Sequence, residues 1–347
     1  MIDANEVCDI SFCLPVYNVC SFLDDCLNSI LKQKLESYNV SYEIFFIDDG
    51  SRDGSYEWLL DRAKNVPWLR VERNDANRGV SYTRNRLMKE ARGRYIWYVD
   101  PDDMLIGDSA IILYNLAEKY KADVMLGNYI RVAENSTFGE EWTQSSDINE
   151  VDATNVKWKL PSDTSGKQMC SVCGGLFLKD FLLKNNLLMN EKMIAQEDTL
   201  FYYEFSLKSQ RIYKCDAYCY LYRQRMSSVM HSHSDERSKK YYLSMLEMLR
   251  VYRKHLETGD FDDKAVLERK IHHSKQNVAQ CLASVRDKKY IKEQFVILKK
   301  EKIYPYKFRK AALDTRPFYL GALTFMLPLK PFFWLYHFVY LKTHKKA

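Results

Sequence analysis

The chain has 347 residues, of which 46% are hydrophobic and 28% are charged, and a formal net charge of +6. This composition excludes a disordered or collagen-like protein, and the length leaves room for one large domain with an appendage. The nine cysteines are odd in number and scattered, which is typical of reduced thiols and disfavours a disulfide framework.

Short apolar runs alternate with amphipathic segments over the first 130 residues, and this alternation predicts repeated βαβ units. The runs that predict strands are Ile10 to Val16, Tyr42 to Ile47, Trp68 to Glu72, Tyr95 to Val99 and Asp123 to Gly127. Apolar residues at helical spacing predict helices over Val19 to Leu31, Tyr56 to Ala63, Val80 to Ala91 and Ile111 to Tyr120. The expected fold class is therefore α/β, with a mostly parallel central sheet flanked by helices.

The pattern changes after this region. Polar residues, glycines and a proline from Val132 to Lys167 predict a long loop or an irregular insertion. Two apolar runs, Arg211 to Ala217 and Tyr218 to Arg223, predict two further strands. Ser238 to Arg286 then predicts two or more amphipathic helices.

An apolar stretch of 24 residues, Phe318 to Leu341, lies near the end of the sequence and is interrupted by two prolines and by Lys330. A spanning helix needs about 20 consecutive apolar residues, and a central lysine costs roughly 2.5 to 3.5 kcal/mol on insertion. We therefore expect a tail of about residues 303–347 to attach to a membrane without crossing it. The alternative is a helical hairpin that packs on the domain or on a second subunit.

The charge distribution supports a membrane partner. Arg286 to Ala347 hold 15 Lys and Arg against 4 Asp and Glu, a net of +11, which leaves −5 for residues 1 to 285. A basic segment that is also apolar favours an anionic membrane surface over nucleic acid. Because Met1 to Asp9 lack the apolar run of a secretory signal, we expect a cytoplasmic protein, peripheral on the inner face of the cell membrane.

Polar residues follow three of the predicted strands, where an open α/β sheet places its ligand. They are Pro15, Tyr17 and Asn18 after the first strand, Asp48 to Ser51 after the second, and Asp100 to Asp103 after the fourth. Carboxylates that converge on one crevice repel each other, so we expect Mg²⁺ or Mn²⁺ held together with the diphosphate of a ligand. The alternative is that these aspartates form turns and cap helices, as we expect of Asp53 and Asp108.

Sequence motifs narrow the function. No G-x-G-x-x-G follows the first strand and no P-loop occurs, which excludes dinucleotide-dependent hydride transfer and nucleotide triphosphatases of those types. The remaining motif segments are Ile10 to Asn18, Ile47 to Ser51, Asn77 to Asn85, Val99 to Asp103, Gln196 to Asp198, and Tyr220 to Ser228 (Y-x-Y-R-x-R-x-x-S). In order and spacing they resemble the family 2 glycosyltransferases of GT-A fold, over roughly residues 9 to 230.

The resemblance implies roles for the matching residues. Pro15, Tyr17 and Asp49 would hold the nucleoside base, Arg84 would lie near the base or diphosphate, and Asp100 would meet the ribose. Asp102, with Asp103, would hold the divalent metal, Asp198 would be the general base, and Glu197, Arg223 and Arg225 would contact the diphosphate or the acceptor. From the residues alone, Asp198 could instead cap a helix over Thr199 to Leu207, Arg84 could be solvated, and Arg223 and Arg225 could be ion-paired strand residues.

Some segments depart from the family pattern. Ser171 to Phe177 contains Cys-Gly-Gly where many family members carry a bulky aromatic and a basic residue, and no Q-x-x-R-W follows Asp198, which disfavours a processive synthase. Cys170 with Cys173, and Cys215 with Cys219, have spacings close to those of zinc ligands, but no histidine flanks either pair.

The resemblance implies a metal-assisted, inverting enzyme that moves one sugar from a nucleotide-diphospho-sugar, with a UDP-sugar as the expected donor. The acceptor would be a lipid-linked saccharide in capsule, exopolysaccharide or O-antigen synthesis. The expected domains are a GT-A domain over residues 1–230, with a donor half at 1–130 and an acceptor half at 131–230, and a helical extension over 231–347. The alternative is a non-catalytic, nucleotide-sugar-binding scaffold, and oligomerisation stays open.

Overall fold

A computed structural model describes residues 7–136, 151–156, 171–225, 234–304, 333–334 and 337–338. The chain divides into two compact units. The first unit comprises residues 1–191 and 197–226, and the second comprises residues 192–196 and 227–347. All the predicted site residues belong to the first unit.

The first unit begins with alternating strands and helices. In chain order they are β1 (Cys8–Val16), α1 (Leu23–Leu31), β2 (Tyr42–Asp48), α2 (Ser55–Ala63), β3 (Leu69–Arg73), α3 (Val80–Glu90), β4 (Gly93–Tyr98), β5 (Met104–Leu105) and α4 (Ser109–Tyr120). A short 3₁₀ turn, Cys20–Phe22, precedes α1, and another, Leu35–Tyr38, follows it. The strands and helices predicted in this region are confirmed, with small shifts at their ends, because each has an apolar face that the core buries.

The rest of the first unit differs from the prediction in two places. Its elements are β6 (Val124–Ala133), β7 (Ala153–Asn155), β8 (Gly175–Leu178), α5 (Lys179–Lys184), α6 (Glu197–Lys208) and β9 (Ile212–Gln224). The prediction of two separate strands was wrong, because buried and exposed side chains go on alternating through Ala217 and Tyr218 to form the single strand β9. The irregular segment begins later than expected, since β6 runs to Ala133, and residues 137–150 and 157–170 lie outside the described residues.

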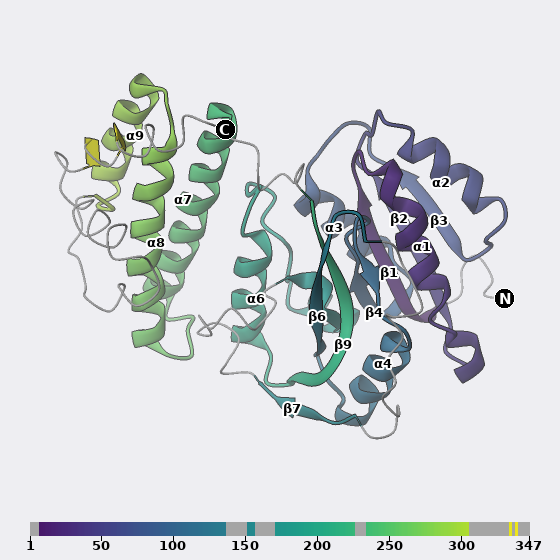
Figure 1. Cartoon of the computed structure of the whole chain (residues 1–347). Coiled ribbons are helices and arrows are strands. Elements are labelled where there is room, and N and C mark those ends of the chain that lie inside the picture. The colour runs from purple at the N-terminus through teal and green to yellow at the C-terminus, as the bar shows by residue number, and fades with distance from the viewer. Residues whose placement is uncertain are drawn as a thin grey trace. The chain divides into compact units, whose positions relative to one another are not determined.

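One sheet joins the strands in the order β3-β2-β1-β4-β8-β6-β9-β5, with β7 beside β9 (Figure 1). The strands β3, β2, β1 and β4 run parallel, whereas β8 is antiparallel to both β4 and β6. Helix α2 packs on β2 and β3, and α3 packs on β1 and β2. The predicted α/β class with a mostly parallel sheet is confirmed, and the carboxyl ends of β1, β2 and β4 share one edge of the sheet.

The sheet is tightly packed where β8 enters it. A Cβ atom added to Gly175 would lie 2.0 Å from the carbonyl oxygen of Met125 in β6, whereas one added to Gly174 would meet no heavy atom within 4 Å. We expect Gly175→Ala to lower the free energy of unfolding by about 1 to 3 kcal/mol, the usual cost of overpacking. Gly174→Ala is the matched control, and denaturant titration measures both variants. Equal midpoints for the two variants would contradict this account of the β6–β8 pairing.

The described helices of the second unit are α7 (Asp235–Thr258), α8 (Lys264–Ser284) and α9 (Lys288–Lys300). The side-chain oxygens of Ser234, Asp263 and Asp287 accept hydrogen bonds from backbone N–H groups in the first turns of these helices, which fixes where each begins. Helices α7 and α8 pack against each other. The prediction of two or more amphipathic helices over Ser238 to Arg286 is confirmed.

Four residues of the apolar tail are described, 333–334 and 337–338. The buried ring of Phe333 packs on Phe295 of α9, with 4.7 Å between ring centroids. The rest of Phe318 to Leu341, which we predicted to attach to a membrane, lies outside the described residues. Within the described ranges, no helix is both long and apolar enough to cross a membrane.

Candidate functional site

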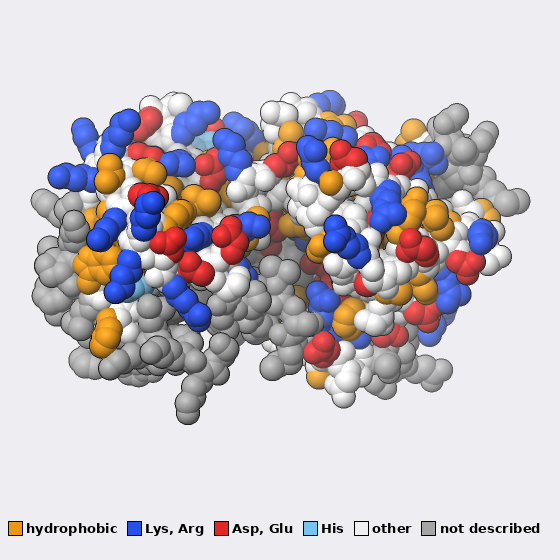
Figure 2. Space-filling model, turned by 90° about the horizontal axis from the view of Figure 1, so that it is seen from above, with side chains coloured by type: hydrophobic (Ala, Val, Ile, Leu, Met, Phe, Trp, Pro, Cys, Tyr) orange, Lys and Arg blue, Asp and Glu red, His pale blue; other side chains and the backbone are white. Residues whose placement is uncertain are grey.

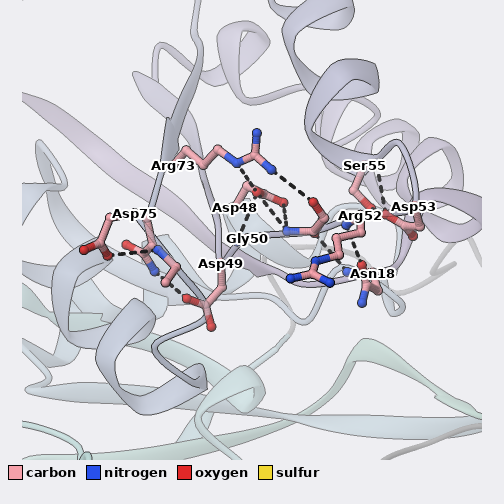
Figure 3. Close-up of polar contacts among 12 residues, drawn as sticks. Asn18, Asp48, Asp49, Gly50, Arg52, Asp53, Ser55, Arg73 and Asp75 are labelled. Carbon is pink, nitrogen blue, oxygen red and sulfur yellow. Dashed lines mark hydrogen bonds and ion pairs between the residues drawn. The ribbon is translucent and has the colours of Figure 1, made fainter.

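The carboxyl end of β1 presents an aromatic side chain to solvent. Pro15 is buried in the strand, whereas the side chain of Tyr17 is 48% exposed. Asn18 follows with a φ of 51°, its N–H donates to Ser51 Oγ at 3.0 Å, and its Oδ1 accepts from the N–H of Arg52 at 2.9 Å (Figure 3). These bonds join the loops after β1 and β2 and fix the backbone beside Tyr17.

Asp48 ends β2 and is fully buried. One carboxylate oxygen lies 3.0 Å from Nε of Arg73, and the carboxylate accepts hydrogen bonds from the N–H groups of Gly50 and Ser51 (Figure 3). Gly50 has a φ of 81°, and a Cβ atom there would lie 3.1 Å from the backbone nitrogen of Asn77, so the turn favours glycine. Asp48 therefore shapes the loop after β2.

Asp49, the next residue, holds the loop that leads into α3. Its Oδ1 accepts from Nδ2 of Asn74 at 2.7 Å and from the N–H of Arg78 at 2.8 Å, and its Oδ2 accepts from the N–H of Gly79 at 2.8 Å. Its own N–H donates to the carbonyl of Val16 at 2.7 Å. The structure therefore brings Asp49 next to the residue that precedes the exposed tyrosine.

The two aspartates that we expected to form turns or caps differ. Asp53 accepts hydrogen bonds from the N–H of Cys20 at 2.9 Å and from the N–H of Ser55 at 3.0 Å, so its role in the turn is confirmed (Figure 3). Asp108 occupies the position before the first residue of α4 but forms no side-chain capping hydrogen bond.

Three aspartates follow β4 in one acidic loop. Asp100 and Asp102 are partly exposed, whereas Asp103 is buried and accepts hydrogen bonds from the hydroxyl of Tyr220 at 2.8 Å and from the N–H of Arg223 at 2.7 Å. Burial and the Asp100 carboxylate raise the pKa of Asp102. Burial and the Asp102 carboxylate raise the pKa of Asp103. Carboxylates grouped in this way favour a bound positive charge.

Two arginines at the end of β9 lie beside these acids. The Nε atom of Arg225 is 2.7 Å from Oδ2 of Asp102, and Nη2 of Arg223 donates to Oδ2 of Asp25 at 2.9 Å. Both guanidinium carbons lie 5.1 Å from the ring centroid of Phe22, within the range of a cation–π interaction. Both arginines are thus ion-paired, Arg223 within β9 and Arg225 just after it, and the pairing keeps two cations next to the acidic loop.

Asp198 lies in the first turn of α6. The helix begins at Glu197, so Asp198 is its second residue and does not precede it as a cap, which was the alternative to a catalytic role. Its Oδ1 accepts a hydrogen bond from the N–H of Thr199 at 2.7 Å. Partial burial and the Glu197 carboxylate raise the pKa of Asp198 to about 7. A carboxylate with this pKa is suited to accept a proton near neutral pH.

Arg84 of α3 joins the acidic loop to the start of α6. Its Nη2 donates to Oδ1 of Asp100 at 2.6 Å, and its Nη1 donates to Oε1 of Glu197 at 3.1 Å. Because the Arg84 side chain is only 5% exposed, the solvated alternative for this residue is excluded.

The acidic loop fits a divalent cation. Carboxylate oxygens are the protein ligands that Mg²⁺ and Mn²⁺ prefer. In the part of the chain that the structure describes, no three His, Cys, Asp or Glu side chains form a complete metal cage. Mg²⁺ in proteins is usually bound by one or two carboxylates together with the phosphates of a ligand. Cys170, one of the four cysteines considered as zinc ligands, lies outside the described residues.

Comparison with known proteins shows what the chain is similar to. The model of the family described as glycosyl transferase family 2 matches residues 11–178, just under half of the chain. Over this segment the chain is similar to that family. The chain is 28% identical over 221 residues to EpsJ of Bacillus subtilis, named as an uncharacterized glycosyltransferase, over 63% of this chain and 62% of EpsJ. It is 30% identical over 218 residues to the poly(ribitol-phosphate) beta-glucosyltransferase of Bacillus spizizenii, over 61% of this chain and 32% of that protein.

Solved structures show the same fold. The chain resembles residues 1–349 of S. aureus TarS in complex with UDP-GlcNAc, with a TM-score of 0.58 and 19% identity over 93% of this chain and 80% of that one. It also resembles the mannosyltransferase PcManGT of Pyrobaculum calidifontis in complex with GDP-Man and Mn²⁺, with a TM-score of 0.52 and 13% identity over 100% and 90% of the two chains. These likenesses show the GT-A fold.

The fold gathers the predicted residues into three groups at the carboxyl edge of the sheet. They are Pro15, Tyr17 and Asp49 at the ends of β1 and β2; Asp100, Arg84, Glu197 and Asp198; and Asp102, Asp103, Arg223 and Arg225. Sequence reasoning missed Asn74 and Asp25. Asn74 directly follows β3, so the strand-end rule that found Asp48 would also have found it. Asp25 lies on a helix and carries no such signal.

Proposed function

We propose that this protein is a glycosyltransferase that transfers a single sugar from a nucleotide-diphospho-sugar, with a UDP-sugar as the expected donor, to a hydroxyl of a lipid-linked saccharide. The observation that carries the proposal is Asp198, whose pKa of about 7 suits a general base and which the contacts of Glu197 and Arg84 connect to Asp100. These contacts support a proton acceptor at Asp198 next to an acidic loop that would bind a diphosphate and its metal. The TarS complex with UDP-GlcNAc supports a UDP-linked donor.

The nucleoside would bind at the ends of β1 and β2. The exposed ring of Tyr17 offers a face on which a base can stack, and Pro15 fixes the strand that carries it. Asp49 holds the adjacent loop through its three hydrogen bonds and would contact the base. Asp100, which is partly exposed, would accept a hydrogen bond from the ribose.

A divalent cation would bind at Asp102, with Asp103 beside it. Both oxygens of Asp103 already accept hydrogen bonds from Tyr220 and Arg223, so Asp102 would be the principal protein ligand. Bound Mn²⁺ or Mg²⁺ would offset the charge of the leaving diphosphate. The guanidinium of Arg225, now paired with Asp102, is a second positive charge within reach of that group. The Mn²⁺ in the PcManGT complex supports the presence of a metal.

The residues support a single displacement. The acceptor hydroxyl oxygen would attack the anomeric carbon, and its proton would pass to the Asp198 carboxylate. The bond between the anomeric carbon and the diphosphate oxygen would break, releasing the nucleoside diphosphate. One displacement at that carbon inverts its configuration, so the proposed enzyme is an inverting one.

Charge and the relatives support the proposed acceptor and location. The poly(ribitol-phosphate) beta-glucosyltransferase supports a polymer of the bacterial surface as the product, such as a capsule, exopolysaccharide or O-antigen. The net charge of +11 from Arg286 to Ala347 would hold the enzyme on the anionic cytoplasmic face of the membrane, where a lipid-linked acceptor is concentrated. Figure 2 shows Lys and Arg side chains, with hydrophobic and acidic ones among them, on one face of the second unit.

Nucleotide-dependent thermal stability tests the donor site. We expect UDP with Mn²⁺ to raise the melting temperature, and GDP, dTDP and CMP to raise it less, because a ligand at about 100 times its dissociation constant adds roughly 2.7 kcal/mol to the native state. If none of the four nucleotides shifts the transition in the presence of Mn²⁺, the donor-site proposal fails. If UDP binds but no UDP-sugar is ever consumed with any lipid-linked acceptor, the scaffold alternative replaces the enzyme.

A further inference from the structure

The side chain of Arg84 binds two carboxylates. Its Nη2 and Nη1 atoms donate to Asp100 and Glu197 at 2.6 and 3.1 Å. The side chain is 5% exposed, and its Nε is buried with no hydrogen-bond partner in the described residues. A guanidinium in this position has little surface to offer a nucleotide. Its two carboxylate partners are 97 positions apart in the chain, so it links distant segments.

The next residue of α3 holds the same region of the chain. Nδ2 of Asn85 donates to the carbonyl of Met189 and to Oε1 of Glu191, each at 2.9 Å, and its Oδ1 accepts from the N–H of Met189 at 2.8 Å. Arg84 and Asn85 are both buried. Two consecutive residues of α3 therefore bind this region: Asn85 bonds to residues 189 and 191, and Arg84 bonds to Glu197.

These contacts determine where the first turn of α6 lies. Helix α6 has 12 residues and begins at Glu197, so the position of its first turn determines where its first side chains lie. Asp198 is adjacent to Glu197, and its Oδ1 accepts a hydrogen bond from the N–H of Thr199 within the same turn. The position of the Asp198 carboxylate relative to the acidic loop therefore depends on the bridge from Asp100 through Arg84 to Glu197.

We infer that Arg84 is a positioning residue, which ties the turn carrying Asp198 to Asp100 instead of contacting the nucleotide. This inference rests on the proposed role of Asp198 as the base. Since misplacement of a reacting group by about 1 Å can cost roughly 100-fold in rate, loss of the bridge acts on the chemical step. The same bridge makes the base sensitive to the occupant of the donor site, because Asp100 is its other end.

The pKa of Asp198 provides an independent test of the inference, because the charged groups around Asp198 shift it. The groups that act on its pKa are Glu197 and Asp100, which raise it, and Arg84, which lowers it. Removal of the guanidinium in Arg84→Met should raise the pKa of Asp198, and Glu197→Gln should lower it. We would follow the carboxyl ¹³C signal of Asp198 in the full chain, assigned by its absence from Asp198→Asn. Arg94→Met, which removes an arginine paired with Glu118, is the control and should leave this pKa unchanged.

Kinetics and binding complete the test. We expect Arg84→Met to lower kcat about 100-fold and to change the dissociation constant of UDP with Mn²⁺ far less, with Arg84→Lys recovering part of the rate. A large loss of UDP affinity, with kcat and the pKa of Asp198 unchanged, would assign Arg84 to the nucleotide and overturn the inference. If Arg84→Met fails to fold, two other measurements test the inference. They are the lower pKa of Asp198 expected in Glu197→Gln and the rate of transfer by Arg84→Lys.

Different experimental results would contradict this inference and the proposed function. If Asp198→Asn transfers sugar at the parent rate, Asp198 is not the base and the role of Arg84 falls with it. If Asp198→Asn is inactive while Arg84→Met keeps the parent kcat and the parent pKa of Asp198, the proposed function survives and the inference about Arg84 alone is wrong.

Discussion

Replacing Asp198 by asparagine should lower the rate of sugar transfer by about 10²- to 10⁴-fold, the range that general-base catalysis contributes. The amide keeps the shape of the side chain and can accept the hydrogen bond from the N–H of Thr199, so the start of α6 should be retained. UDP with Mn²⁺ should bind to the variant as it does to the parent, because the substitution removes the proton acceptor and no proposed contact to the donor. Initial rates and calorimetric titration of UDP measure the two effects separately.

The pKa of Asp198 predicts the direction in which the rate of transfer changes with pH. The base acts when deprotonated, and partial burial together with the Glu197 carboxylate raises the pKa of Asp198 to about 7. The rate should therefore rise with pH through about 7 and level off above it. Glu197→Gln should move the rise to lower pH, because it removes a negative charge next to the base.

A matched control separates the base from a general effect of charge. Asp180 is an exposed acid in the first turn of α5, and Asp180→Asn should keep both the rate and its pH profile. Equal transfer by Asp198→Asn and the parent enzyme would remove Asp198 from the base role.

Local patterns in the sequence were sufficient for most of the fold. The apolar stripes at helical spacing and the short apolar runs predicted the strands and helices of the first 130 residues, because each such element needs one buried face. The prediction failed where that signal is ambiguous. An alternating run such as Ile212 to Gln224 looks the same as one long strand or as two short ones, and only its pairing with β6 decides.

The site was predictable to the extent that it lies at strand ends. The rule that ligands bind beyond the carboxyl ends of parallel strands found Asp49 and Asp100 without knowledge of the packing. It could not give the partners of these residues. Arg84 and Glu197 are 113 positions apart, and Arg223 and Asp25 are 198 apart. Such pairs depend on how helices dock on the sheet, which the periodicity of one sequence does not encode.

Asp102→Asn should remove the dependence of UDP binding on Mn²⁺. Asp102 is the partly exposed carboxylate of the acidic loop, whereas Asp103 is buried and its oxygens are occupied by Tyr220 and Arg223. Loss of an outer partner of a metal ligand already costs about 10- to 100-fold in metal affinity, so loss of the ligand itself should cost at least as much. Titration of UDP with and without Mn²⁺, and electron paramagnetic resonance of free Mn²⁺, measure this directly.

Asp108→Asn is the matched control, because Asp108 lies in the chain just after the acidic loop and makes no side-chain capping bond. It should keep the parent response to Mn²⁺. The pairing of Asp102 with Arg225 allows a second outcome to be recognised. If Asp102 serves only to hold Arg225, Asp102→Asn will weaken UDP binding equally with and without Mn²⁺. An equal loss would therefore assign Asp102 to the arginine and exclude it as a metal ligand, whereas a loss confined to the samples with Mn²⁺ supports the metal role.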